Sequence, residues 1–164
     1  IFLWASCWQR PASNLECKFM SKHLSVIVGS MLGAAEYVAD ALEDVAKRAG
    51  YTVVIHLEPD LAEIPVDSRW VICTSTHGAG ELPDNIQTFA RQVKQANLDQ
   101  TQAYIIGLGD SSYDTYCYGA IEMEKIILEA GASLLAPPLH IDVLNHPIPE
   151  DEAVVWFENI LADQ

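Results

Sequence analysis

The segment STHGAGELPDN, which begins at Ser75, carries residue types that could hold a ligand close to the backbone. Ser75 and Thr76 offer hydroxyl groups, whereas Gly78 and Gly80 allow a flat ligand to approach the main chain without meeting a side chain. His77 has no metal-ligand spacing with the other histidines, so a solvated loop histidine is the alternative interpretation. We therefore expect a ligand loop here and no metal site.

A second segment, GSMLGAAEYV, begins at Gly29 and joins an apolar run to a helical pattern. A glycine-containing turn at the start of a helix presents backbone N–H groups and the positive end of the helix dipole, which together favour phosphate. The candidate phosphate-binding residues are Ser30, Met31, Leu32, Gly33, Ala34 and Ala35. An ordinary strand-to-helix turn is the alternative, and the missing GK[ST] sequence argues against a nucleotide hydrolase.

A third segment, GLGDSSYDTYCYG at residues 107–119, places three tyrosines close together in a loop. Exposed tyrosine rings can stack on a planar ligand, although packing beneath the following helix is the alternative for at least one of them. The candidate residues are Leu108, Gly109, Asp110, Tyr113, Tyr116 and Cys117. The GxG sequence alone is weak evidence for a dinucleotide site, because no glycine completes GxGxxG.

The pattern around these segments alternates between strands and helices. We expect strands at 24–28, 51–57, 69–74, 103–109 and 139–143, and helices at 34–49, 84–96, 119–130 and 150–162. Apolar strands separated by helices indicate a parallel sheet with helices on both faces. Ligands bind such sheets beyond the carboxyl ends of the strands, so the three loops should meet in one crevice and suit a phosphorylated planar cofactor.

The composition limits the possible partners and the compartment. A net charge of −14 argues against nucleic-acid binding and against docking on anionic lipids, and we expect no membrane association. The four cysteines form no CxxC pair, which favours a reducing, cytoplasmic location over a disulfide framework. Residues 1–19 have no clear period and are interpreted as a disordered upstream extension, with one domain at 20–164.

The second and third segments resemble the flavin loops of the flavodoxin-like FMN-binding family. GLGDSSYDTYC is also similar to the flavodoxin-type domains of sulfite reductase and cytochrome P450 reductase, and GSMLGAAEYVADAL and NHPIPED resemble small bacterial members of the family. The similarity runs from about Met20 to the C-terminus. It implies a three-layer, doubly wound α/β fold of the short-chain type, with a five-stranded parallel sheet in the order 2-1-3-4-5 and FMN at the switch point.

The resemblance also implies roles for the candidate residues. Residues 30–35 would hold the phosphate, residues 75–80 would border the flavin ring, and residues 108–117 would cover its other side, with Tyr113 stacked on it and His77 flanking the inner face. The common phosphate loop has hydroxyl side chains where this sequence has Leu32 and Ala34. We therefore expect weaker FMN binding than in a typical flavodoxin.

The implied function is electron transfer by bound FMN, without a substrate of the protein's own. The acidic residues Glu81, Asp84, Asp110 and Asp114 would disfavour negative charge on the reduced ring and lower its potential, unless they are only solvated loop residues. The resemblance implies a basic-faced flavodoxin reductase as donor and an iron–sulfur or radical enzyme, such as biotin synthase, as acceptor.

Two alternatives use the same fold. A phosphate-sensing receiver module needs an acidic cluster at the ends of the first and third strands, and the sequence has none there. An interaction protein that lost its flavin is supported by Leu32 and Ala34, whereas the tyrosine-rich loop argues against it.

Overall fold

The computed structural model describes residues 22–164, so the extension expected at residues 1–19 lies outside the described part of the chain. Its strands are β1 (His23–Gly29), β2 (Thr52–His56), β3 (Arg69–Ser75), β4 (Gln102–Gly109), β5 (Ser133–Leu134) and β6 (Leu139–Asp142). Every strand pairing among these is parallel, in the order β2-β1-β3-β4-β5, with β6 also paired to β4. The expected order 2-1-3-4-5 is confirmed.

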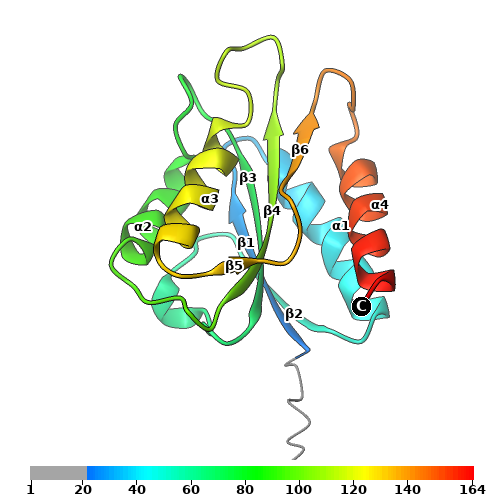
Figure 1. Ribbon diagram of the computed structural model, residues 1–164. Coiled ribbons are helices and arrows are strands. Elements are labelled where there is room, and N and C mark those ends of the chain that lie inside the picture. The colour runs from blue at the N-terminus through cyan, green and yellow to red at the C-terminus, as the bar shows by residue number, and fades with distance from the viewer. Residues whose placement is uncertain (1–21) are drawn as a thin grey trace, which may run out of the picture.

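The helices are α1 (Ala34–Arg48), α2 (Asp84–Val93), α3 (Tyr118–Glu129) and α4 (Pro149–Ala162), together with a 3-10 turn, η1, at Leu61–Glu63. In Figure 1, α2 and α3 cover one face of the sheet, and α1 and α4 cover the other. This is the expected three-layer, doubly wound α/β arrangement. No helix within residues 22–164 is long and apolar enough to cross a membrane.

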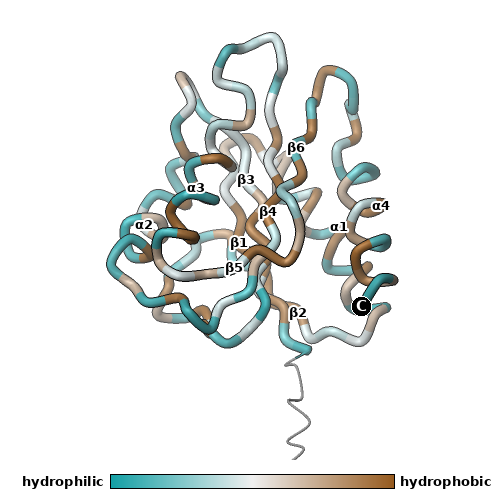
Figure 2. The backbone as a smooth tube through the Cα atoms, viewed as in Figure 1, coloured by the Kyte–Doolittle hydropathy of each residue, from teal (hydrophilic) through white to brown (hydrophobic). Residues whose placement is uncertain are grey.

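Two apolar cores fill the spaces between the sheet and its helices. Val26 and Val28 point from β1 into the core on the α1 and α4 side, which also contains Phe157. Ile27, between them in the sequence, points into the opposite core with Phe89 of α2. Figure 2 shows apolar residues concentrated along the strands between the helix layers. The strands are continuously apolar because both faces of the sheet are covered.

The fifth position of the sheet differs from the single strand expected at 139–143. Two short strands occupy it, because β5 pairs with the beginning of β4 and β6 pairs with its end. Pro137 and Pro138 lie between them, and proline has no N–H group to continue the ladder of hydrogen bonds. The expected strand is therefore the second half of an interrupted edge.

The expected helix at 84–96 is too long, since α2 ends at Val93. Beyond this residue, Gln95 donates its backbone N–H to Gln92, and Ala96 donates to Val93. These bonds span three residues instead of four, so the α-helix tightens into 3-10 turns at its end.

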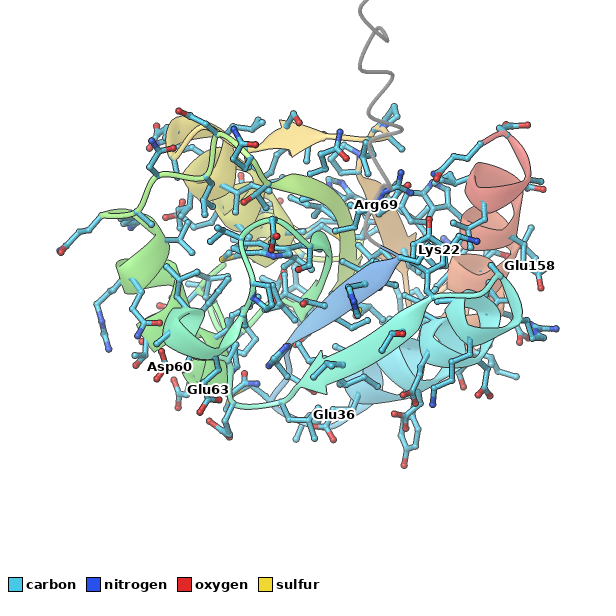
Figure 3. All side chains as sticks on the ribbon, turned by 90° about the horizontal axis from the view of Figure 1, so that it is seen from below. Lys22, Glu36, Asp60, Glu63, Arg69 and Glu158 are labelled. Atoms are coloured by element: carbon cyan, nitrogen blue, oxygen red, sulfur yellow. The ribbon has the colours of Figure 1, made fainter. Side chains whose placement is uncertain are left out.

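A polar cluster closes the end of the sheet opposite the carboxyl ends of the strands. Arg69 begins β3 close to Lys22, as Figure 3 shows, and donates from its guanidinium to the Tyr51 hydroxyl at 2.6 Å and to Gln164. The Gln164 amide in turn donates to the Tyr104 hydroxyl at 2.6 Å. The bonds connect the end of the chain, just after α4, to the sheet, far from the three candidate loops.

Candidate functional site

The three candidate loops leave the carboxyl ends of β1, β3 and β4, which are neighbours in the sheet. Gly29 pairs with Thr74 across β1 and β3, and Ser75 pairs with Leu108 across β3 and β4. The loops after these strands therefore lie together at one end of the molecule, the upper end in Figure 1. The prediction that the three loops follow neighbouring strands at one end of the sheet is confirmed.

The first loop offers unused backbone donors. Gly33 has a φ of 91° and donates its N–H to the Ser30 hydroxyl oxygen at 2.9 Å, which turns the chain into α1. Within residues 22–164, four further N–H groups of this loop donate no hydrogen bond, those of Met31, Leu32, Ala34 and Ala35. Free N–H groups at the positive end of a helix suit a phosphate dianion. The loop thus fits the FMN phosphate through its main chain.

The second loop is a tight turn fastened at both ends. His77 and Glu81 exchange backbone hydrogen bonds of 2.8 Å in both directions. Gly78 and Gly80 have φ values of 51° and 109°, and a Cβ atom on Gly80 would lie 2.9 Å from the ring of Tyr118. Gly80 therefore lets the turn close against α3.

The two hydroxyl residues that precede this turn are used for structure. The Ser75 hydroxyl donates to the Gly29 carbonyl at 3.3 Å, and the Thr76 hydroxyl accepts the Gly119 N–H at 3.1 Å. A Cβ atom on Gly119 would lie 2.5 Å from the Ser75 carbonyl oxygen. Glycine at the start of α3 is thus what allows the helix to approach the loop so closely.

A cleft of about 320 Å³ separates the second loop from the third. Its lining consists of Thr76, Gly78, Gly109, Asp110, Tyr113, Thr115 and Tyr116. All of these except Thr115 are candidates from the sequence, so the structure brings the two loops together as expected. Ser75, His77, Gly80 and the residues of the first loop lie outside this lining.

The aromatic and sulfur groups of the third loop have different environments. Tyr113 is 65% exposed at the cleft, whereas Tyr116 is half-buried with its ring edge against His140 at 6.3 Å between centroids. Leu108 and Cys117 are buried beneath the loop, so their side chains support it from below. Burial raises the pKa of the Tyr116 hydroxyl to about 12 and that of the Cys117 thiol to about 11. Both groups are therefore neutral near pH 7.

Asp142, at the end of β6, is a supporting residue that the sequence analysis did not identify. Its carboxylate accepts hydrogen bonds from the Ser111 N–H and hydroxyl, from the Leu144 N–H at 3.1 Å and from the Asn145 amide at 2.7 Å. These bonds, led by the Ser111 hydroxyl, hold the pKa of Asp142 below its usual value. Asp142 thus fixes the third loop to the loop after β6. The sequence contains one sign of this role, which is the single acidic residue at the end of the predicted strand LHIDV.

Asn85 is a second supporting residue, and it lies within the STHGAGELPDN segment itself. Its side-chain amide, in the first turn of α2, contacts Ser30 of the first loop, Val28 of β1 and Leu57 after β2. The sequence showed the residue but not its partners, which are 28 to 57 positions away.

Comparison with known proteins identifies the family. The Flavodoxin family profile matches residues 26–157. The MioC homolog of Haemophilus influenzae is 37% identical over 141 residues, covering 85% of this chain and 97% of the relative. MioC of Escherichia coli is 38% identical, covering 82% and 92%. Among solved structures, a point mutant of flavodoxin from Pseudomonas aeruginosa superposes with a TM-score of 0.77 at 29% identity, covering 85% of this chain and 97% of that one. The chain therefore belongs to the flavodoxin family of FMN-binding electron-transfer proteins.

Proposed function

We propose that this flavodoxin binds FMN across the three loops, with the phosphate on residues 30–35 and the ring between residues 75–80 and Tyr113. The cleft between the second and third loops, at the same end of the sheet as the free N–H groups of the first loop, is the observation that carries the proposal. When bound, FMN supplies the redox chemistry, and the protein residues bind, orient and shield it.

Each loop has a separate task in this proposal. The four free N–H groups of the first loop would bind the phosphate oxygens, and the Ser30 hydroxyl, which accepts from Gly33, retains its own proton to donate. The exposed ring of Tyr113 would cover one face of the flavin and exclude water there. Gly78 adds no side chain of its own to the opposite wall, so its backbone can border the ring.

Acidic residues around the cleft would tune the potential. Asp110 lines the cleft and accepts hydrogen bonds from the Ser112 N–H at 2.8 Å and from the Ser112 hydroxyl. A carboxylate held at this position disfavours added negative charge on the ring and lowers its reduction potential. Asp110→Asn should therefore raise the potential, as measured by equilibration with reference dyes, and an unchanged potential would refute this role.

The same end of the molecule suits a partner with a basic, partly apolar face. Leu32 and Leu144 are 97% and 58% exposed there, and Glu81, Asp84 and Asp114 are exposed on the neighbouring loops. Opposite charge would steer such a partner to the flavin edge. We propose a basic-faced flavodoxin reductase as donor, an iron–sulfur or radical enzyme such as biotin synthase as acceptor, and the cytoplasm as the location.

FMN titration of the flavin-free protein tests the cofactor site. We expect saturable quenching of flavin fluorescence, with a lower dissociation constant for FMN than for riboflavin, because only FMN carries the phosphate. Absence of saturable binding would leave the flavin-free interaction protein as the surviving alternative.

The partner proposal has its own assay. Product formation by biotin synthase should depend on this protein in the presence of a reductase and its reductant, and should fall at high ionic strength as the steering is screened. Activity that is equal with and without the protein would refute biotin synthase as the acceptor.

A further inference from the structure

The amide of Asn85 joins three segments of the chain with short hydrogen bonds. Its Nδ2 atom donates to the Val28 carbonyl at 2.8 Å and to the Leu57 carbonyl at 2.7 Å, and its Oδ1 atom accepts the Ser30 N–H at 3.0 Å. The reversed amide would place its oxygen against two carbonyl oxygens. The bonding pattern therefore fixes the orientation of the amide.

These bonds control the geometry of the first loop from below. Ser30 is held by Asn85 through its N–H, and the Ser30 hydroxyl in turn accepts the N–H of Gly33. A chain of hydrogen bonds thus runs from the first turn of α2, through Ser30, to the residue that precedes α1. The direction of the four free N–H groups in the loop, those of Met31, Leu32, Ala34 and Ala35, depends on this chain.

A loop with few hydroxyl side chains is especially sensitive to its backbone geometry. Leu32 and Ala34 cannot donate to a phosphate from their side chains, so the N–H groups must supply the contacts that hydroxyls would otherwise share. Apart from the Ser30 hydroxyl, the loop has no hydroxyl side chain that could compensate for misdirected backbone donors.

We propose that Asn85 is a positioning residue for the phosphate of FMN, an inference that rests on the proposed function of the first loop. Asn85 acts through Ser30 and Gly33 and does not line the ring cleft. Its loss should weaken the binding of the phosphate and leave the binding of the ring unchanged.

Dissociation constants of the full-length, flavin-free protein for FMN and riboflavin test this proposal. Asn85→Ala should raise the dissociation constant for FMN at least tenfold and change that for riboflavin less than twofold. Asn85→Asp should weaken FMN binding further, because its carboxylate would face two carbonyl oxygens and the phosphate charge. Asn85→Ser replaces any variant that does not fold, and it should also raise the dissociation constant for FMN and leave that for riboflavin unchanged.

Gln87→Ala is the matched control from the same helix. The Gln87 amide donates to the Leu82 carbonyl at 3.1 Å and to Asp84 at 3.3 Å, and it does not contact the first loop. Its removal should change neither dissociation constant. The ³¹P chemical shift of bound FMN provides a second measurement, which should move in Asn85→Ala and stay in Gln87→Ala.

The outcomes separate this proposal from the function on which it rests. If the unmodified protein binds FMN no more tightly than riboflavin, the proposed phosphate site fails and this inference fails with it. If the unmodified protein prefers FMN but Asn85→Ala keeps that preference, only the positioning role is overturned. An equal loss of FMN and riboflavin would also overturn it, because that result indicates general structural damage.

Discussion

Leu32 is the position at which a single hydroxyl should strengthen FMN binding. It is 97% exposed in the first loop, and its own backbone N–H group is free, as is that of Met31 beside it. Replacement of so exposed a side chain should change the stability by no more than about 0.5 kcal/mol. A hydroxyl donating to a phosphate contributes about 1.5–3 kcal/mol, and the lower end applies in an exposed loop where the hydroxyl gives up bound water. We therefore expect Leu32→Ser to tighten FMN binding about tenfold.

Fluorescence titration with FMN and riboflavin is the assay for this variant. The gain should be confined to FMN, because riboflavin lacks the phosphate. Leu144→Ser is the control, since Leu144 is an exposed leucine on the loop after β6 and is not part of the phosphate loop. An unchanged FMN affinity in Leu32→Ser, or an equal gain for riboflavin, would show that hydroxyl content at this position does not limit phosphate binding.

Three further predictions concern the other loops. Tyr113→Ala should weaken FMN and riboflavin binding alike, roughly fivefold for the loss of about 1 kcal/mol of stacking, and a loss confined to FMN would contradict stacking. Gly80→Ala should lower the free energy of unfolding by about 1–3 kcal/mol in denaturant titrations, because φ is 109° and the new Cβ would lie 2.9 Å from Tyr118. An unchanged midpoint and slope of the unfolding curve would contradict this prediction. The carboxylate of Asp142 has a lowered pKa, so its contribution to stability is complete above the ordinary value of 3.8 and is lost as the pH falls through the folded pKa. The difference in melting temperature between the unmodified protein and Asp142→Asn should therefore shrink over that acidic range, and a constant difference would argue against the carboxylate.

Much of the fold could be predicted because its signals are local. The runs at 24–28 and 69–74 are apolar on both faces, which only a covered sheet explains, and Gly50 and Gly131 follow helices in the left-handed conformation that ends them. β5 escaped prediction because a two-residue strand has no period to detect. Its pairing depends on the neighbouring β4, which the sequence of β5 does not reveal.

The parts of the site that could not be predicted are contacts between distant residues. Cys117 was a candidate for the cofactor, yet the structure buries it at a φ of 54°, with its thiol packed close to the backbone of Gly107 and Gly109. Its position next to Tyr116 in the sequence gave no sign that the two side chains would face different environments. Asp142 and Asn85 show the converse, since polar residues that looked ordinary in the sequence hold two of the three loops in place.

The affinity of the first loop for phosphate depends on side chains, which a sequence shows, and on backbone donors, which it does not. Side chains can be counted in a sequence, and the absence of hydroxyls at Leu32 and Ala34 predicts a weak phosphate site. Backbone donors cannot be counted in the same way, because whether an N–H group is free depends on where the chain turns. The turn here depends on Gly33 at a φ of 91° and on the hydrogen bond that the Ser30 N–H donates to Asn85. If Leu32→Ser gains little while Asn85→Ala loses much, the affinity of this loop resides in its backbone geometry; the reverse result would place it in the side chains.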